Sequence, residues 1–292
     1  MPESPHRHIA HELAWATVEL QRAGVDTPQL DATVLLAHCA GLTRTQLVTR
    51  QRLELTEEQN DLFRNMVSRR CERSPLPYLI GRKEFWGLEF EVNASTLIPR
   101  PETEVLVEAA AEWLRGRAAA IAEIGVGSGA IAVALAKELS EAVVYGTEIS
   151  PGAASTAMRN VERHSVANRV KILTGDLTAP LFDEGLSGRI DALVSNPPYV
   201  SSDAVDRLQP EVLYEPREAI IAGPDALHFH KLILADAPLL VKPGGRVFLE
   251  IDHGQGQEVA EIANSVGTTL LETRRDLAGL ERVVILECVS SR

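Results

Sequence analysis

From Pro101 onward, apolar segments that predict strands alternate with segments that predict helices. The expected strands lie near residues 120–126, 142–149, 170–176, 190–196, 245–251, 268–275 and 282–289. The expected helices lie near residues 102–115, 129–139, 151–164, 225–240 and 255–265. Because this alternation is typical of parallel strands joined by helical crossovers, it predicts an α/β fold, with a mainly parallel sheet covered by helices on both faces.

The N-terminal region has a different pattern. Apolar residues recur with a helical period from Ile9, and later helices are expected to begin at Thr27-Pro28 and at Thr56. Three basic residues near the end of this region are expected on a solvated helix face: Arg69, Arg70 and Arg73. We therefore predict a small all-helical domain over residues 1–75.

A short connector follows the helical region. In the run SPLPYLIGRKEFWGLEFEVNAS the prolines end the last helix, and apolar side chains at Trp86, Leu88 and Phe90 alternate with Gly87 and Glu89. Since alternation with period two predicts strands, we expect a β-hairpin linker over residues 76–100. Residues 101–292 then form the α/β domain.

Composition and charge exclude several classes of protein. The chain has 292 residues, of which 45% are hydrophobic, so it can bury a large core. A formal net charge of −12 argues against direct nucleic-acid binding, because the average field repels phosphates. The three cysteines form no CxxC pair, which favours reduced thiols and predicts no metal site. No apolar run approaches a membrane span, and we expect a cytoplasmic protein without a membrane partner.

The first strand of the predicted sheet ends in a glycine-rich turn. In AEIGVGSGAIAVALA, Gly125, Gly127 and Gly129 follow a strand and precede a helix, where glycine lets a nucleotide approach the backbone closely. The same spacing, completed by Ala130, also satisfies a dinucleotide fingerprint. The glycines alone therefore leave a dehydrogenase open beside other nucleoside-binding enzymes.

Three acidic residues stand at strand ends near this turn. Glu148 ends the next strand, where a carboxylate can hold ribose hydroxyls, and Asp176 ends the third, where it can contact an adenine edge. Glu123 stands two residues before Gly125, and we expect its carboxylate to face the mouth of the site. There it would repel a pyrophosphate but suit the cationic end of S-adenosylmethionine, so the set favours that cofactor.

The run VSNPPYV ends the fourth strand, beside the crevice where open α/β sheets bind ligands. Since proline has no N–H, Pro197 and Pro198 cannot continue the strand ladder, and the Pro197 carbonyl is left free. The side-chain carbonyl of Asn196 lies beside it, so two acceptors fit one planar NH₂ group. Tyr199 offers a flat wall for a conjugated group.

This arrangement predicts a chemistry. A planar NH₂ group is a poor nucleophile, because its lone pair is delocalised into a carbonyl or a ring. Hydrogen bonds to Asn196 and Pro197 would fix that lone pair toward an incoming methyl group, and near-attack placement at ~3–3.5 Å lowers the barrier to methyl transfer from a sulfonium. Such a transfer requires no metal, no covalent nucleophile and no strong base.

Taken together, seven runs resemble the HemK/PrmC family, the peptide chain release factor glutamine N5-methyltransferases, over nearly the full chain. They are PYLIGRKEFWGLEFEV, LIPRPETEVLV, IGVGSGAIAVALA, VSNPPYV, EPREAIIAG, LVKPGGRVFLEI and RRDLAGLERVV. The combination is specific, whereas NPPY alone is shared with adenine N6-methyltransferases.

The resemblance implies a class I S-adenosylmethionine-dependent methyltransferase domain, Rossmann-like with a seven-stranded mainly parallel sheet, behind an N-terminal helical domain that binds the release factor. It implies that the substrate is the glutamine of the GGQ motif of bacterial class 1 release factors. In the family, Asn196 and Pro197 would hold that amide, with Pro198 and Tyr199 as its walls. The implied cofactor-binding residues are Glu123, Gly125, Val126, Gly127, Ser128, Gly129, Glu148, Asp176, Leu177 and Asn196.

Some positions depart from the family pattern. Glu148 replaces the usual aspartate, Val126 a threonine, and Leu177 an aromatic residue beside the adenine, which concerns cofactor affinity and loop geometry. Two related activities stay open: methylation of adenine N6 and of a ribosomal-protein glutamine. A base methyltransferase should carry basic and aromatic surface, yet aromatic residues make up 4% of the chain. A binding module that has lost its chemistry is disfavoured by the intact NPPY tetrad.

Overall fold

The structure, a computed structural model, describes residues 8–289 and divides into two compact units. The first unit comprises the residues up to Arg82 together with Gln209–Tyr214. The second comprises Lys83–Leu208 and the residues from Glu215 onward. The described residues contain no helix of the length and apolar character that crossing a bilayer requires.

The first unit is helical. Its helices are α1 (Ile9–Arg22), α2 (Pro28–Ala40), α3 (Arg44–Thr49), α4 (Glu57–Cys71) and α5 (Leu76–Ile80). Their apolar faces meet in one core, in which Leu20, Leu35 and Phe63 are fully buried. The predicted starts of α2 and α4 are confirmed, and α4 begins with a capping box between Thr56 and Gln59 that satisfies two free backbone N–H groups.

Arg70 in α4 is buried rather than solvated, so the prediction for this residue is wrong. Its Nε donates to Asp31 Oδ2 at 2.7 Å, and its Nη2 pairs with Glu211 Oε1 at 2.8 Å. Arg73 pairs with the other oxygen of Glu211, also at 2.8 Å. Glu211 comes from a short 3-10 helix, η3 (Pro210–Tyr214), and these acidic partners, distant in sequence, replace water around the guanidinium.

A hairpin precedes the large sheet. Its strands are β1 (Arg82–Phe85) and β2 (Leu88–Glu91), and its turn is Trp86-Gly87, with φ of 53° and 66°. Two consecutive positive φ values are typical of a tight hairpin turn that matches the twist of the strands. The predicted hairpin is confirmed, but Trp86 lies in the turn and not on a strand as the alternation indicated.

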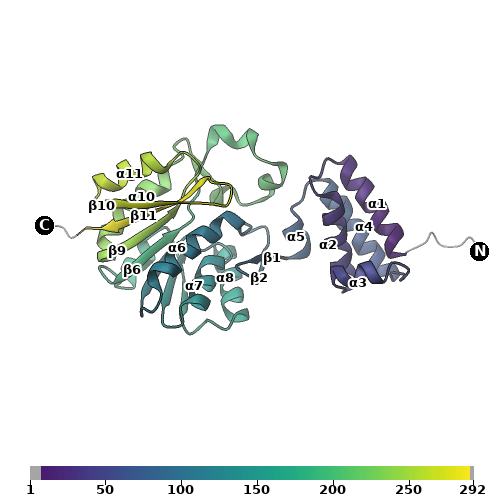
Figure 1. The fold of residues 1–292 in the computed structure, drawn as a ribbon, viewed down its shortest axis with the longest axis horizontal. Coiled ribbons are helices and arrows are strands. Elements are labelled where there is room, and N and C mark those ends of the chain that lie inside the picture. Colours follow the sequence, from purple (N-terminus) through teal and green to yellow (C-terminus); the bar gives the residue numbers. More distant parts are fainter. Residues whose placement is uncertain (1–7, 290–292) are drawn as a thin grey trace, which may run out of the picture. The chain divides into compact units, whose positions relative to one another are not determined.

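The second unit is built on a seven-stranded sheet of order β10-β11-β9-β6-β3-β4-β5 (Figure 1). The strands are β3 (Ala120–Ile124), β4 (Val143–Glu148), β5 (Val170–Thr174), β6 (Ile190–Ser195), β9 (Val241–Glu250), β10 (Thr268–Arg275) and β11 (Glu281–Cys288). β11 pairs antiparallel with both its neighbours, and the other pairings are parallel. This confirms the predicted mainly parallel α/β fold.

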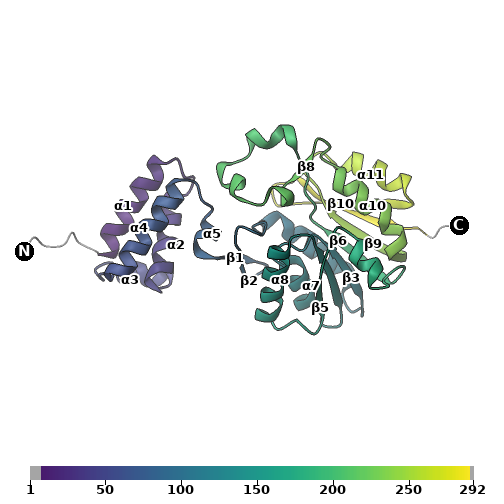
Figure 2. The ribbon, with the colours of Figure 1, turned by 180° about the vertical axis from the view of Figure 1, so that it is seen from behind.

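Helices cover both faces of this sheet, as Figure 2 shows from behind. One apolar core joins the sheet to α6 (Glu104–Leu114), α7 (Ala130–Glu138), α8 (Pro151–Arg163) and the hairpin side chains Phe85 and Phe90. The other core joins it to α9 (Ala179–Asp183), α10 (His228–Leu240) and α11 (Gly256–Ser265). The central strands are therefore enclosed on both sides.

The order of the strands places a crevice at the carboxyl ends of β3 and β6. The chain runs from β3 outward through β4 to β5 and then returns to β6 on the other side of β3. Such a reversal of direction is the point at which open α/β sheets bind ligands. The side-chain hydroxyl of Ser195 donates to the Ile124 carbonyl at 2.7 Å and so holds these two strand ends together.

Candidate active site

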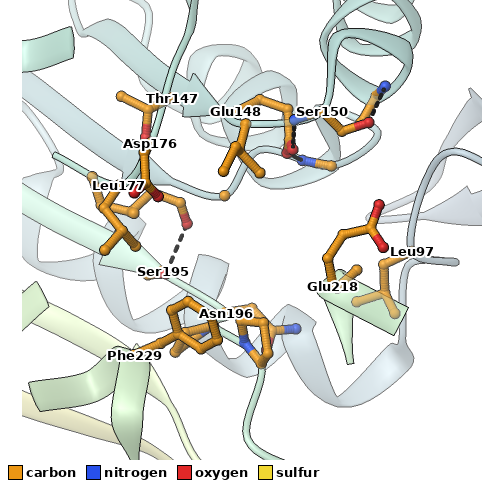
Figure 3. Close-up of a pocket in the computed structure, with 18 of the residues that line it drawn as sticks. Leu97, Thr147, Glu148, Ser150, Asp176, Leu177, Ser195, Asn196, Glu218 and Phe229 are labelled. Atoms are coloured by element: carbon orange, nitrogen blue, oxygen red, sulfur yellow. Dashed lines mark hydrogen bonds between the residues drawn. The ribbon is translucent and has the colours of Figure 1, made fainter. Parts of the chain in front are cut away.

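A pocket opens at the carboxyl ends of β3, β4, β5 and β6 (Figure 3), with a volume of about 890 Å³ counted out to its open mouth. Eight of the residues predicted for the site line it: Gly125, Gly127, Glu148, Asp176, Leu177, Asn196, Pro197 and Pro198. The other five do not: Glu123, Val126, Ser128, Gly129 and Tyr199. The structure thus brings together residues from four separate strand ends.

The glycine turn after β3 gives the pocket an open backbone wall. Gly125 and Gly127 have φ of 76° and 56°, a conformation that L side chains rarely adopt, and a Cβ on either would meet no protein atom within 4 Å. Gly129 serves another purpose, since its Cβ would lie 3.2 Å from that of Ala157 in α8. The first two glycines leave room for a ligand, and the third lets two helices approach.

The Glu148 carboxylate connects the glycine turn to the start of α8. Its Oε2 accepts the backbone N–H of Gly127 at 2.8 Å, and its Oε1 accepts that of Ser150 at 2.9 Å (Figure 3). Asp176 lies further along the rim, beyond the end of β5, and is exposed. Both carboxylates border the pocket, as predicted.

Glu123 is fully buried, so the prediction that it faces the mouth of the site is wrong. Within the described residues neither of its carboxyl oxygens has a hydrogen-bond partner. Burial raises the pKa of Glu123 well above its usual value; the nearby Ala132 backbone N–H opposes the rise, and the negative charge of Glu148 adds to it. The reason is its place on β3, an interior strand of the sheet, where helices cover both faces.

Val126 and Ser128 support the turn from within the protein. Val126 is 4% exposed and packs against β4, where a Cβ added to Gly146 would lie 2.4 Å from Val126 Cγ2. The Ser128 carbonyl accepts a hydrogen bond of 2.8 Å from Asn160 Nδ2. The valine that departs from the family pattern is thus a packing residue and not part of the pocket lining.

The Asn-Pro-Pro-Tyr tetrad follows β6 directly. The amide nitrogen of Asn196 donates to the Thr103 hydroxyl at 3.2 Å. Within residues 8–289 no hydrogen-bond donor reaches Asn196 Oδ1 or the Pro197 carbonyl. Because Pro197 has no N–H and ends the ladder, two acceptors are available at one corner of the pocket.

Tyr199 points its hydroxyl elsewhere, toward Glu250 at the end of β9, to whose Oε1 it donates at 3.4 Å. Burial raises the pKa of the Tyr199 phenol, and the negative charge of Glu250 raises it further, so the hydroxyl stays protonated near neutral pH. A role for the ring as a wall of the substrate slot remains a prediction.

Several lining residues were not predicted individually. Leu97 and Glu218 belong to the segments LIPRPETE and EPREAIIAG, which border the pocket and are joined by Glu215: its carboxyl accepts the Ile98 N–H at 2.9 Å and pairs with Arg100. Phe229, at the start of α10, also lines the pocket and offers an aromatic surface. Leu177, another lining residue, stands at the position where the family usually has an aromatic side chain. No sequence signal marks Phe229, because an apolar residue on a helix usually packs in a core.

The sheet order, the glycine turn and the pocket define a class I methyltransferase, whose cofactor is S-adenosylmethionine. A crystal structure of a methyltransferase from Pyrococcus furiosus has the same fold, with a TM-score of 0.52 at 21% identity over 71% of this chain and 92% of that one. Residues 101–219 match the family model of the methyltransferase small domain. The residues of the pocket fit the cofactor, because open glycine backbone, two rim carboxylates and apolar walls suit a nucleoside with a charged tail.

Residues 12–81 match the model of the PrmC N-terminal domain. The release factor glutamine methyltransferase of Geobacter sulfurreducens is 43% identical over 279 residues, which covers 94% of this chain and 95% of that protein. The protein of the same name from Moorella thermoacetica is also 43% identical, over 94% and 96% of the two chains. The chain therefore belongs to the HemK/PrmC family of release factor glutamine methyltransferases, and it is an enzyme.

Proposed function

We propose that this enzyme methylates the side-chain amide nitrogen, N5, of the glutamine in the GGQ motif of bacterial class 1 release factors. Relatives at 43% identity carry the name of that activity over nearly their whole length. The observation that carries the proposal is the pair of free acceptors, Asn196 Oδ1 and the Pro197 carbonyl, at one corner of the cofactor pocket.

The two acceptors suit a primary amide. Each accepts one proton of the NH₂ group, which holds the amide plane and turns the nitrogen toward the cofactor. S-adenosylmethionine, when bound, supplies a methyl group on a cationic sulfur. Pro197 is buried, and Pro198 and Phe229 add apolar surface to the pocket, so water is excluded from the place where the nitrogen must lie.

The other site assignments belong to the same proposal. Gly125 and Gly127 admit the cofactor to the backbone, Glu148 and Asp176 hold its nucleoside, and Leu177 lies beside the adenine. The helical unit matched by the PrmC N-terminal model binds the release factor. We further propose that the enzyme acts in the cytoplasm and does not bind nucleic acid directly.

The proposal is tested by incubating the enzyme with methyl-labelled S-adenosylmethionine and, separately, a purified class 1 release factor, ribosomal proteins and DNA, and then mapping the label by mass spectrometry. We expect one methyl group on the GGQ glutamine. Label on a ribosomal-protein glutamine would support that sibling activity, and label on adenine would support a base methyltransferase. Either result without label on the release factor rejects the proposal.

A further inference from the structure

Glu250 stands beside the tetrad and is not among the residues assigned to the cofactor or the substrate. β6 and β9 run parallel, with Ser195 opposite Leu249. Asn196 directly follows β6, and Glu250 is the last residue of β9, so the register brings the glutamate to the same edge of the sheet as the amide-binding asparagine. It lies in LVKPGGRVFLEI, where it is the acidic residue of an otherwise apolar strand end.

The Glu250 carboxyl group is buried against polar side chains. It is 1% exposed, and its Oε1 accepts from Tyr199. Within the described residues its Oε2 has no hydrogen-bond partner. Burial raises the pKa of Glu250 to about 7, although the nearby hydroxyls of Thr103 and Tyr199 and the charge of Arg282 oppose the rise. An apolar side chain would avoid this cost of burial, so packing alone does not account for a glutamate here.

Thr103 connects Glu250 to Asn196. The Thr103 hydroxyl accepts from Asn196 Nδ2 at 3.2 Å and interacts with the Glu250 carboxyl. A hydroxyl has one proton to donate, and an ionised carboxylate can only accept. Above a pH of about 7, where Glu250 is ionised, the neighbouring carboxylate can only receive the Thr103 proton. Thr103 is then left to accept from Asn196 Nδ2, as it does in the structure, and Asn196 Oδ1 is left to face the pocket.

We propose that Glu250 is a positioning residue for methyl transfer, which acts through Thr103 to hold the Asn196 amide with its oxygen toward the substrate. Its bond to the Tyr199 hydroxyl fixes the last residue of the same tetrad. The inference rests on the proposed function, because the orientation of Asn196 matters only if Oδ1 accepts a hydrogen bond from a substrate NH₂ group.

Glutamine at position 250 would remove this control. An amide can donate as well as accept, so the Thr103 hydroxyl could turn and donate to Asn196. The asparagine would then present its NH₂ group to the substrate NH₂ group, and two donors would meet where one bond should form. The cofactor pocket would be unaffected, since Glu250 does not line it.

The test measures kcat and KM at pH 8, where Glu250 is ionised, for methylation of a release factor. The enzymes compared are the wild type, Glu250→Gln, Thr103→Val, Thr103→Ser and the Glu250→Gln/Thr103→Val double variant. Glu287→Gln, the same change on β11, is the control. We expect kcat to fall about 10-fold to 100-fold in Glu250→Gln and in Thr103→Val, the usual effect of losing an orienting partner. The affinity for S-adenosylmethionine stays unchanged, and Thr103→Ser, which keeps a hydroxyl, retains much more activity than Thr103→Val.

Non-additivity is the deciding result. If the residues act in one chain, the double variant is no slower than the slower single variant. Multiplied losses in the double variant, equal losses with serine and valine, or a wild-type kcat in Glu250→Gln would each overturn the inference. If Thr103→Val does not fold, the kcat of Glu250→Gln, compared with the wild type and with Glu287→Gln, decides the inference. Absence of glutamine labelling by the wild type would instead count against the proposed function.

Discussion

Glu148 and Gly127 are joined by a hydrogen bond of 2.8 Å, in which the backbone N–H of the glycine turn donates to a carboxylate oxygen. The second oxygen accepts from Ser150 at the start of α8, at 2.9 Å. One carboxylate thus holds the turn after β3 against the end of β4. Both oxygens of Glu148 therefore already accept a backbone N–H. A hydrogen bond from a ribose hydroxyl must use the second lone pair of one of these oxygens.

Replacing Glu148 by Gln should weaken cofactor binding. A glutamine has one acceptor oxygen, so one of the two backbone N–H groups would face an NH₂ group. Loss of one hydrogen bond to a charged acceptor costs about 1.5–3 kcal/mol, which predicts about a 10-fold or greater rise in the Kd for S-adenosylmethionine, measured by calorimetry. Glu141→Gln, at an exposed position before β4, is the control. Equal affinity in both variants contradicts this role.

Gly146 and Val126 form a tight contact under the glycine turn. A methyl group at position 146 would lie 2.4 Å from Val126 Cγ2, so Gly146→Ala should destabilise the fold by about 1–3 kcal/mol through overpacking. Adding Val126→Ala makes room and should recover part of that loss in urea unfolding. A double variant no more stable than Gly146→Ala would show that the strain lies elsewhere.

Glu211 should hold η3 onto α4. Burial would raise the pKa of Glu211, but hydrogen bonds from Arg73 and Arg70 lower it below the usual value. Its ionised form therefore stabilises the folded state above the unfolded-state pKa, and this contribution is lost as pH falls through the lower folded-state pKa.

Glu211→Gln should weaken this segment by about 1–2 kcal/mol, since the pairs are only partly buried. Hydrogen exchange of the backbone N–H groups of residues 211–214 at neutral pH should be about 10-fold faster. Glu58→Gln, exposed in the first turn of α4, serves as the control. Unchanged exchange in Glu211→Gln would mean that Arg70 and Arg73 do not hold the segment.

Glu250 should make stability depend on pH in the opposite direction. Its pKa is raised to about 7 in the folded state, so the folded protein binds more protons than the unfolded chain between pH of about 4.5 and 7. Stability from this group is present at low pH, falls as pH rises through that window, and is constant above it. The facing groups are Tyr199, Glu102 and Arg282, with His230 bonded to the Glu250 backbone carbonyl.

Glu250→Gln should remove this decline. At pH 8 the variant should be more stable than the wild type by up to about 3 kcal/mol, while being the slower enzyme. Thermal and urea unfolding from pH 5 to 8 measures the difference in stability between the variant and the wild type. The contribution of buried Glu123 cancels in this difference, because both proteins contain it. Parallel stability curves for the two proteins would show that Glu250 is not held with a raised pKa.

The strands of the sheet could be predicted because most of the parallel strands are apolar runs that are followed within two residues by a glycine, an acidic residue or a proline. The predicted range of β10 is the observed one, and β3 to β6 begin within one residue of prediction. α3, α5 and α9 could not be predicted, since helices of five or six residues show no period. The turn at Trp86 was hidden by an alternation that continues across it.

The pocket could be predicted in part, for a related reason. Residues that follow strands directly, such as Gly125, Glu148 and Asn196, meet at one edge of the sheet once the strands are parallel. The burial of Glu123 and Arg70 depends on what packs against them from distant segments, which a local pattern does not contain. Phe229 and Glu250 likewise gain their places from the strand order and not from their neighbours in sequence.

The role of Asn196 in holding the substrate amide is tested by comparing Asn196→Ala with the wild type in methylation of a release factor and in cofactor binding. We predict a fall of about 100-fold or more in kcat, because one of the two acceptors that hold the amide is lost, and a Kd for S-adenosylmethionine within about twofold of the wild type. Methylation at the wild-type rate by Asn196→Ala would show that Asn196 does not hold the substrate amide.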